Sequence, residues 1–327
     1  MLEKRQKLKK KKPSEGYPSP ANSLETPRFA GLSTFMRLPH LPDAKRLDVA
    51  LIGVPFDGGT SYRPGARFGP RHVREQSALI RPYNPVLDLS PFDLVRVADY
   101  GDLAINPLSI DDTFKRITRG LGPVLEAGTV PICVGGDHSI LLPILRAMHA
   151  KHGPVALIQF DAHSDTWDQY WGMKYSHGTP VRRAIEEGLL AEPFILQIGL
   201  RGQLYDKHDM NFAREHGIVM ITAEEFHERG LPLVRKKRKA FKDHKVYFSL
   251  DIDVVDPAFA PGTGTPQVGG LSSVQILDLV RSMAGLNLVG CDLVEVSPQY
   301  DSAEITSLLA ANLLFEQLCL ISRSFSR

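Results

Sequence analysis

The residues that follow the apolar run Val155–Phe160 could bind a metal ion. The run itself predicts a buried parallel strand. Asp161, His163 and Asp165 follow it at alternate positions, where the chain leaves the sheet and where α/β sheets commonly carry their sites. On their own, these three residues could equally be a helix cap and solvated loop charges.

Three further apolar runs also end in side chains that can do chemistry. They are 130–134, followed by His138; 245–250, followed by Asp251 and Asp253; and 288–294, followed by Glu295. Buried charges are costly unless they are paired or bound to a metal, so core packing alone does not explain this pattern. Two imidazoles and several carboxylates suit a pair of divalent ions such as manganese. The absence of a CxxC pair argues against a structural zinc site.

Four motifs carry a resemblance to a known family. They are GGDHS (135–139), DAHSD (161–165), SLDIDVVDP (249–257) and VEVSP (294–298). Together they resemble the arginase/agmatinase (ureohydrolase) family, in particular its agmatinase-like branch, which includes guanidinobutyrase-type enzymes. The resemblance covers about residues 28–322. It implies one three-layer α/β domain, at 28–327, with a mainly parallel central sheet and helices on both faces.

The resemblance also implies the metal ligands. His138 and Asp165 would hold one ion, His163 and Asp253 the other, and Asp161 and Asp251 would bridge the two. Two Mn²⁺ ions per subunit are expected, with Ni²⁺ as the alternative. The implied reaction is attack of a metal-bridging hydroxide on a guanidinium carbon, which releases urea and an amine.

Three residues have expected roles in that reaction. Glu295 would bind the guanidinium through two parallel hydrogen bonds. Asp165 would carry a proton to the departing amine, and His177 would shuttle protons near neutral pH. The alternative for His177 is a loop histidine that caps a helix.

The loop 166–176 suggests which substrate the enzyme takes. Trp167, Asp168 and Trp171 are expected to contact the part of the substrate beyond the guanidinium. Aromatic faces attract cations, so agmatine is the first expectation. The alternatives are guanidine, a biguanide such as metformin, 3-guanidinopropanoate and 4-guanidinobutanoate; a carboxylate tail would need Lys174, Arg63 or Arg201. The tryptophans could instead pack against a neighbouring subunit or the segment 29–41.

Composition and charge bound the other possibilities. Residues 1–12 hold seven Lys/Arg and one Glu, whereas the whole chain has a net charge of +2. The rest of the chain is therefore net acidic, and nucleic-acid binding is not predicted. Residues 1–27 are expected to form a disordered basic tail, with targeting or binding to an anionic polymer as the alternative. Three cysteines, no evident signal peptide and no apolar stretch taken as a membrane span predict a cytoplasmic protein that does not contact membranes.

The expected assembly leaves open one alternative in which the chain is not itself an active enzyme. The resemblance implies a homo-oligomer, a trimer or a hexamer. The chain could also be a catalytically silent subunit that assembles with an active paralogue. A silent subunit should have lost metal ligands, whereas this sequence keeps all six together with His177 and Glu295.

Overall fold

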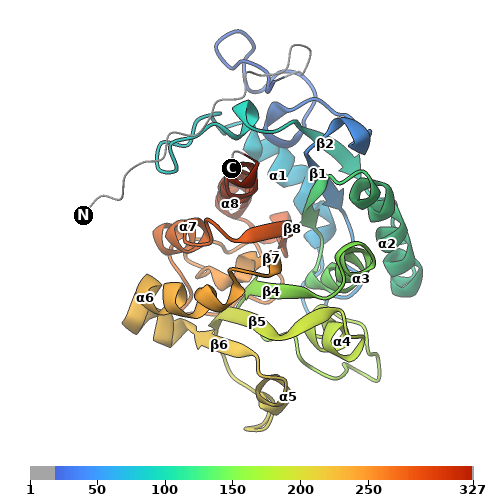
Figure 1. Ribbon diagram of the computed structural model, residues 1–327, viewed down its shortest axis with the longest axis vertical. Helices are drawn as coiled ribbons and strands as arrows, with labels where there is room; N and C mark the ends of the chain where they lie inside the picture. Colours follow the sequence, from blue (N-terminus) through green and yellow to red (C-terminus); the bar gives the residue numbers. More distant parts are fainter. Residues whose placement is uncertain (1–18, 326–327) are drawn as a thin grey trace.

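The computed structural model describes residues 19–325. Its centre is a parallel eight-stranded sheet (Figure 1). The strands lie in the order β2-β1-β3-β8-β7-β4-β5-β6, and every pairing is parallel. Their bounds are β1 Val49–Val54, β2 Val97–Asp102, β3 Val130–Gly135, β4 Val155–Phe160, β5 Leu190–Leu200, β6 Val219–Thr222, β7 Lys245–Asp251 and β8 Asn287–Val294. The mainly parallel central sheet that the resemblance implies is confirmed.

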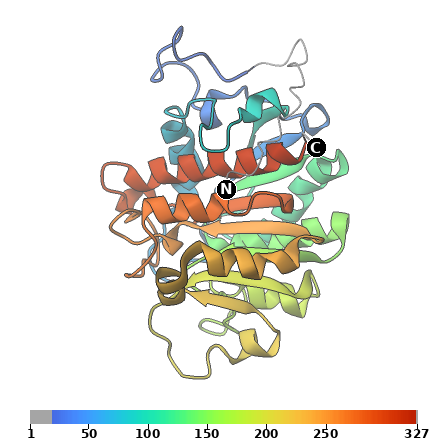
Figure 2. The same ribbon diagram turned by 60° about the vertical axis from the view of Figure 1, so that its left-hand side comes forward.

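Helices cover both faces of the sheet, which gives three layers (Figures 1 and 2). One face carries α2 (Ile110–Glu126), α3 (Leu141–His152) and α4 (Pro180–Glu186). The other carries α1 (Gly69–Ser77), α6 (Ala223–Lys237), α7 (Ser273–Arg281) and α8 (Ile305–Ser324). The short helix α5 (Asn211–Glu215) lies beside the edge strand β6 (Figure 1).

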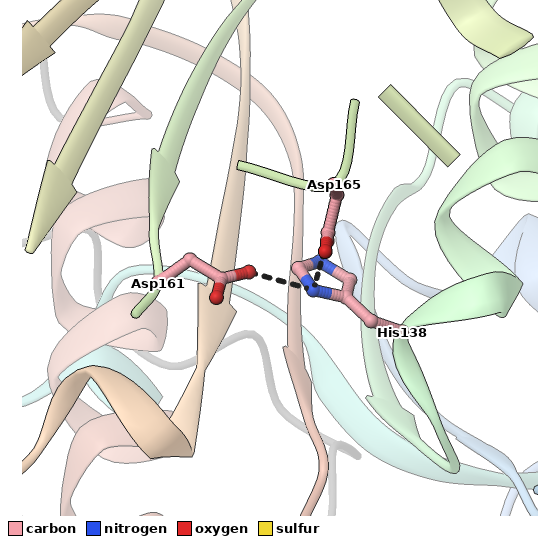
Figure 3. Close-up of side chains that lie close together, drawn as sticks. All are labelled: His138, Asp161 and Asp165. Carbon is pink, nitrogen blue, oxygen red and sulfur yellow. Dashed lines mark ion pairs between the residues drawn. The ribbon is translucent and has the colours of Figure 1, made fainter. Parts of the chain in front are cut away.

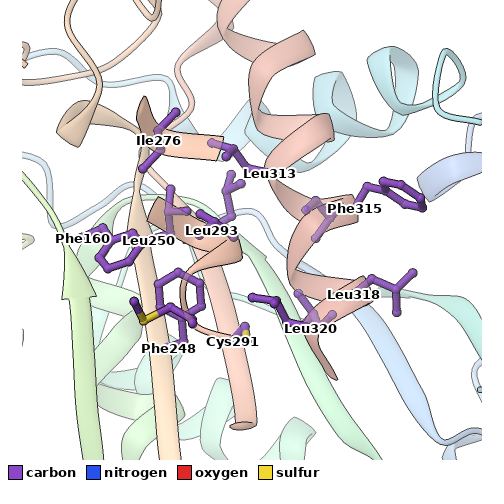
Figure 4. Close-up of a cluster of buried hydrophobic side chains, with 14 of the residues drawn as sticks. Phe160, Phe248, Leu250, Ile276, Cys291, Leu293, Leu313, Phe315, Leu318 and Leu320 are labelled. Atoms are coloured by element: carbon purple, nitrogen blue, oxygen red, sulfur yellow. The ribbon is translucent and has the colours of Figure 1, made fainter. Parts of the chain in front are cut away.

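Each face of the sheet has its own hydrophobic core. On the α8 side, Phe160 and Phe248 meet edge to face with ring centroids 4.8 Å apart, and Leu293 packs toward Leu313 of α8 (Figure 4). Burying one such side chain stabilises the fold by about 1.5–3 kcal/mol. All six residues of β4 are buried, as expected for a strand covered on both sides. The core therefore holds the ends of the central strands in fixed positions.

The four strands that end in polar residues are neighbours at the centre of the sheet, in the order β3-β8-β7-β4. Phe160 pairs with Leu250, and Asp251 pairs with Val294. Beyond β8, the Glu295 amide donates to the Gly136 carbonyl oxygen, 2.9 Å away. A Cβ at position 136 would lie 2.2 Å from the Phe56 carbonyl oxygen, so only glycine allows this approach. The polar residues after all four strands are thus brought to one edge.

The sequence also predicts a strand over 93–98 and a helix over 206–216, and both elements are shorter in the structure. The strand, β2, begins only at Val97, because Pro91–Asp93 form a 3-10 turn. The helix is reduced to α5. Asp206 and Asp209 accept hydrogen bonds from nearby backbone amides at 2.8–2.9 Å, and such local bonds compete with helix formation.

The helix α8 corrects one expectation about apolar stretches. By length and composition α8 is apolar enough to cross a membrane, whereas no apolar stretch of the sequence was expected to be a membrane span. However, 83% of its most apolar window is buried inside the protein, which is the environment of a core helix.

The predicted tail, 1–27, lies mostly outside the described residues. Of the part that is described, the Ala21 amide donates to the Arg37 carbonyl oxygen at 3.1 Å. The Arg37 guanidinium donates to the Ser23 hydroxyl at the same distance.

Candidate metal centre

The first group of polar side chains surrounds one nitrogen of His138 (Figure 3). Its Nδ1 lies 2.9 Å from Asp161 Oδ2, 2.9 Å from Asp165 Oδ2 and 3.3 Å from Asp251 Oδ2. These side chains come from the ends of β3, β4 and β7 and are at most 5% exposed. Three carboxylate oxygens around one imidazole nitrogen form a compact, negatively charged site.

A hydrogen-bonded relay fixes which nitrogen of His138 faces that site. The Ser249 hydroxyl donates to Asp292 at 2.7 Å, so its oxygen accepts from His138 Nε2, 2.8 Å away. The Tyr247 hydroxyl also donates to Asp292, at 2.9 Å. Because this relay keeps the proton of Nε2 in place, Nδ1 is the nitrogen left to bind a metal ion, which is how a buried partner sets the tautomer of a metal-binding histidine.

The second group shares Asp161 with the first. His163 Nδ1 lies 3.0 Å from Asp253 Oδ2 and 3.6 Å from Asp161 Oδ1. Asp161 therefore turns one oxygen to each group. The His163 side chain is 28% exposed, whereas the carboxylates are almost fully buried, so the site meets solvent on the His163 side.

Several observations show that the site suits cations. Apart from the ion-pair contacts given above, His138 Nδ1 and Asp253 Oδ2, one atom from each group, are buried and have no hydrogen-bond partner in the described part of the chain, although such atoms are rarely left unpaired. Burial opposes a charge on His138, but Asp165 and Asp161 outweigh it and hold the pKa of His138 well above its usual value. Burial, followed by the charge of Asp161, raises the pKa of Asp165 to about 7. Carboxylate and imidazole ligands in two adjoining sets fit a pair of divalent ions.

Asp251 is oriented by the loop that follows β7. Its Oδ1 accepts from the Asp253 amide at 2.8 Å, which leaves Oδ2 directed at the first group. Burial, followed by the charge of Asp253, raises the pKa of Asp251 well above its usual value. The other carboxylate expected to bridge, that of Asp161, accepts a hydrogen bond from the side-chain amide of Gln159 at 2.7 Å. The assignment of each ligand to an ion stays a prediction.

Glu295 and His177 form a pair beside these groups. Glu295 Oε1 accepts from the His138 amide at 2.9 Å and lies 3.0 Å from His177 Nδ1. Glu295 Oε2 is buried and has no hydrogen-bond partner among residues 19–325. Burial disfavours a charged His177, but the charge of Glu295 and its hydrogen bond prevail and raise the pKa of His177 to about 8.

His177 has partners for both of its protonation states. When Nε2 is bare it accepts from the Ser61 amide at 3.1 Å; when protonated, it can donate to the Ser61 hydroxyl at 2.6 Å. The His177 backbone amide is held by the Gly59 carbonyl oxygen at 2.9 Å. A histidine that is satisfied either way can gain and lose a proton without rearrangement.

The loop 166–176 is placed near this pair, but its predicted residues differ in their surroundings. The Trp167 amide donates to the Gly178 carbonyl oxygen at 3.1 Å, and its ring packs 5.4 Å from that of Tyr205. Asp168 is paired with Arg183, 2.8 Å away, so its charge is already balanced. Trp171 is 81% exposed. Their contact with substrate stays a prediction.

Three buried polar residues that orient the expected metal ligands through hydrogen bonds were not predicted from the motifs. Gln159, Gln197 and Ser249 are polar residues inside otherwise apolar strands and are fully buried. Gln159 donates to Asp161 and Asp165, and Gln197 donates in turn to the Gln159 oxygen at 2.7 Å. Their signal was present in the sequence, because an isolated polar residue in a buried strand needs a partner.

Comparisons with known proteins agree with this geometry. Residues 47–319 match the model of the arginase family. A guanidinopropionase of Pseudomonas aeruginosa is 50% identical over 96% of this chain and 99% of its own length. A mitochondrial agmatinase of Gallus gallus is 47% identical over 90% and 87% of the two chains. The solved structure of proclavaminate amidinohydrolase from Streptomyces clavuligerus superposes with a TM-score of 0.88 at 44% identity, covering 91% and 100%. The chain belongs to the arginase family.

Proposed function

We propose that the protein is an amidinohydrolase that cleaves a C–N bond of a guanidino compound and releases urea and an amine with the help of two divalent ions. The observation that carries this proposal is the pair of ligand groups that share Asp161. The unpartnered Glu295 Oε2 beside them is a ready acceptor for a guanidinium.

The chemistry divides among the residues. Bound divalent ions would supply an activated water as the nucleophile and would be held by His138, Asp161, His163, Asp165, Asp251 and Asp253. Glu295 binds and orients the guanidinium through charge-assisted hydrogen bonds. Asp165 accepts a proton from the attacking water and returns it to the departing amine nitrogen. His177, with its pKa raised to about 8, exchanges protons through Nε2.

Three finer expectations belong to the same proposal. Manganese is the expected metal and nickel the alternative, because the donor set does not separate them. A homo-oligomer is the expected assembly. The cytoplasmic location rests on the composition of the sequence, while the Gallus gallus relative is described as mitochondrial.

Metal analysis followed by a urea-release assay tests the proposal. We expect about two bound ions per chain and metal-dependent urea release from at least one member of a panel of agmatine, 3-guanidinopropanoate, 4-guanidinobutanoate, guanidine and metformin. Two bound ions with no urea from any compound, in the protein alone and mixed with a paralogue, would refute the proposed function. Activity only in the mixture would instead indicate the silent subunit.

A further inference from the structure

We propose that Arg63 binds a carboxylate on the substrate, so that the preferred substrate is a guanidino acid. This inference rests on the proposed function and names the substrate class of the same site. It begins from Arg63, whose guanidinium carbon lies 5.4 Å from the ring centroid of Tyr62 and 5.1 Å from that of Tyr300. Among residues 19–325, no acidic group forms an ion pair with Arg63.

The backbone around Arg63 is tied to the site. Two residues earlier, Ser61 contacts His177 through both its amide and its hydroxyl. A Cβ added to Gly264 would lie 3.1 Å from the Arg63 carbonyl oxygen and 3.3 Å from Glu295 Oε2. The segment that carries Arg63 is therefore next to the unpartnered oxygen that faces the guanidinium end of a substrate.

A short guanidino acid is the substrate that this arrangement favours. In 4-guanidinobutanoate, five bonds separate the guanidinium carbon from the carboxylate carbon, which is roughly 6 Å in an extended chain. The Arg63 carbonyl oxygen and Glu295 Oε2 lie on either side of the space beside Gly264, so a substrate held by Glu295 has the Arg63 loop next to it. We assign the carboxylate end of the substrate to the Arg63 guanidinium of that loop.

The surroundings of Arg63 favour a carboxylate partner. Cation–π contacts with the two tyrosine rings do not use the N–H groups of the guanidinium as ion-pair donors, and these N–H groups match the two oxygens of a carboxylate. Tyr300 and Glu295 both lie in the segment that follows β8, so this segment would carry residues at both ends of the substrate. The two tyrosines would hold the guanidinium in place before the substrate arrives.

Other charged residues near the site are already engaged. Arg201 donates to several backbone carbonyl oxygens, including those of Asp253 at 2.6 Å and Gln267 at 2.8 Å. Asp168, the acid in the loop 166–176 that would attract a cationic tail, is paired with Arg183. The exposed Lys174 of the same loop is the remaining rival. The ranking that follows from Arg63 places guanidino acids before agmatine, the first expectation from the loop sequence.

Substrate preference and binding in matched variants test the proposal. In the metal-loaded full chain we expect kcat/KM to be higher for 4-guanidinobutanoate or 3-guanidinopropanoate than for agmatine. R63Q should lower the ratio of kcat/KM for the preferred acid to that for agmatine by about 10- to 100-fold, the effect of losing hydrogen bonds to a charged group. R63K should recover part of the ratio, and K174Q should keep the wild-type ratio.

A calorimetric titration with 4-guanidinobutanoate separates this inference from the proposed function. If no compound yields urea, the proposed function fails, and Arg63 is then judged by binding alone. Weaker binding to R63Q than to the wild type supports the inference. Equal binding, an unchanged ratio in R63Q, a loss in K174Q instead, or a wild-type preference for agmatine would each overturn it.

Discussion

Replacing Glu295 by glutamine separates substrate binding from metal binding. The two atoms of the Glu295 carboxylate have different tasks: Oε1 accepts from the His138 amide and contacts His177, whereas Oε2 is buried without a partner. An amide can keep the first set of contacts through its oxygen. At the second position it presents N–H donors, and these oppose the N–H groups of a guanidinium.

The expected loss follows from removing one member of a buried charge pair. Such a change costs about 2–5 kcal/mol, which corresponds to a rise in KM of about 30-fold to several thousand-fold. The metal content should stay at the wild-type level, because Glu295 belongs to neither ligand group. Glu304→Gln, an exposed acid in the segment before α8, is the matched control and should change neither quantity.

The same variant has a second readout in His177. Its pKa, about 8 with Glu295 present, should fall, because the charge and the hydrogen bond of Glu295 are the largest effects that oppose burial, and only the weaker effects of Asp137 and Asp165 remain without them. The raised pKa stabilises the metal-free protein by about 2 kcal/mol below pH 6.5, and this is lost as the pH rises through 8. E295Q should lose that pH dependence. NMR titration measures the pKa of His177, and thermal unfolding at several pH values measures the stability. An unchanged KM with a His177 pKa still near 8 would refute the reasoning.

Three further variants test the remaining roles. Asp251→Asn should weaken both ions, because an amide oxygen is a poor bridging ligand; two tightly held ions on metal analysis would contradict the bridge. His177→Ala should lower kcat by about 10²- to 10⁴-fold with unchanged metal content, whereas His149→Ala in the last turn of α3 should not; equal kcat values would return His177 to a structural role. Trp171→Ala should change the ranking of guanidino compounds of different tail length without loss of metal, and an unchanged ranking would remove the loop from substrate recognition.

The sequence predicted the parts of the fold that depend on local patterns. The run Val155–Phe160 is a strand in the structure, with the predicted bounds, because its apolar residues are buried on both faces. Asp161, His163 and Asp165 converge with His138, Asp251 and Asp253 because parallel strands end at one edge. Asp256, which precedes Pro257 in the motif SLDIDVVDP and is typical of a backbone-capping residue, accepts hydrogen bonds from the backbone amides of Ala258, Gly269 and Gly270.

The sequence did not predict contacts between side chains that are distant along the chain. Asp168, whose contact with a substrate stays a prediction, is paired with Arg183 of α4, fifteen residues later, and no local pattern predicts this ion pair. Arg63 was one of three candidate partners for a carboxylate. Its cation–π contact with Tyr300 depends on the packing of two loops that are far apart in the sequence. Such pairings follow from the packing of the whole domain, which no local pattern encodes.

Two functional carboxylates have a backbone conformation that the sequence also leaves open. Asp165 and Glu295 have φ angles of 53° and 65°, in the left-handed region that residues other than glycine rarely adopt. Each costs about 1–3 kcal/mol, which surrounding contacts must offset. The Asp165 carbonyl oxygen accepts from the Val181 amide at the start of α4, and the Glu295 amide donates to Gly136. Glycine would relax both positions but would remove the carboxylates. In this conformation the Asp165 carboxylate lies 2.9 Å from His138 Nδ1, and the Glu295 carboxylate contacts the His138 amide and His177.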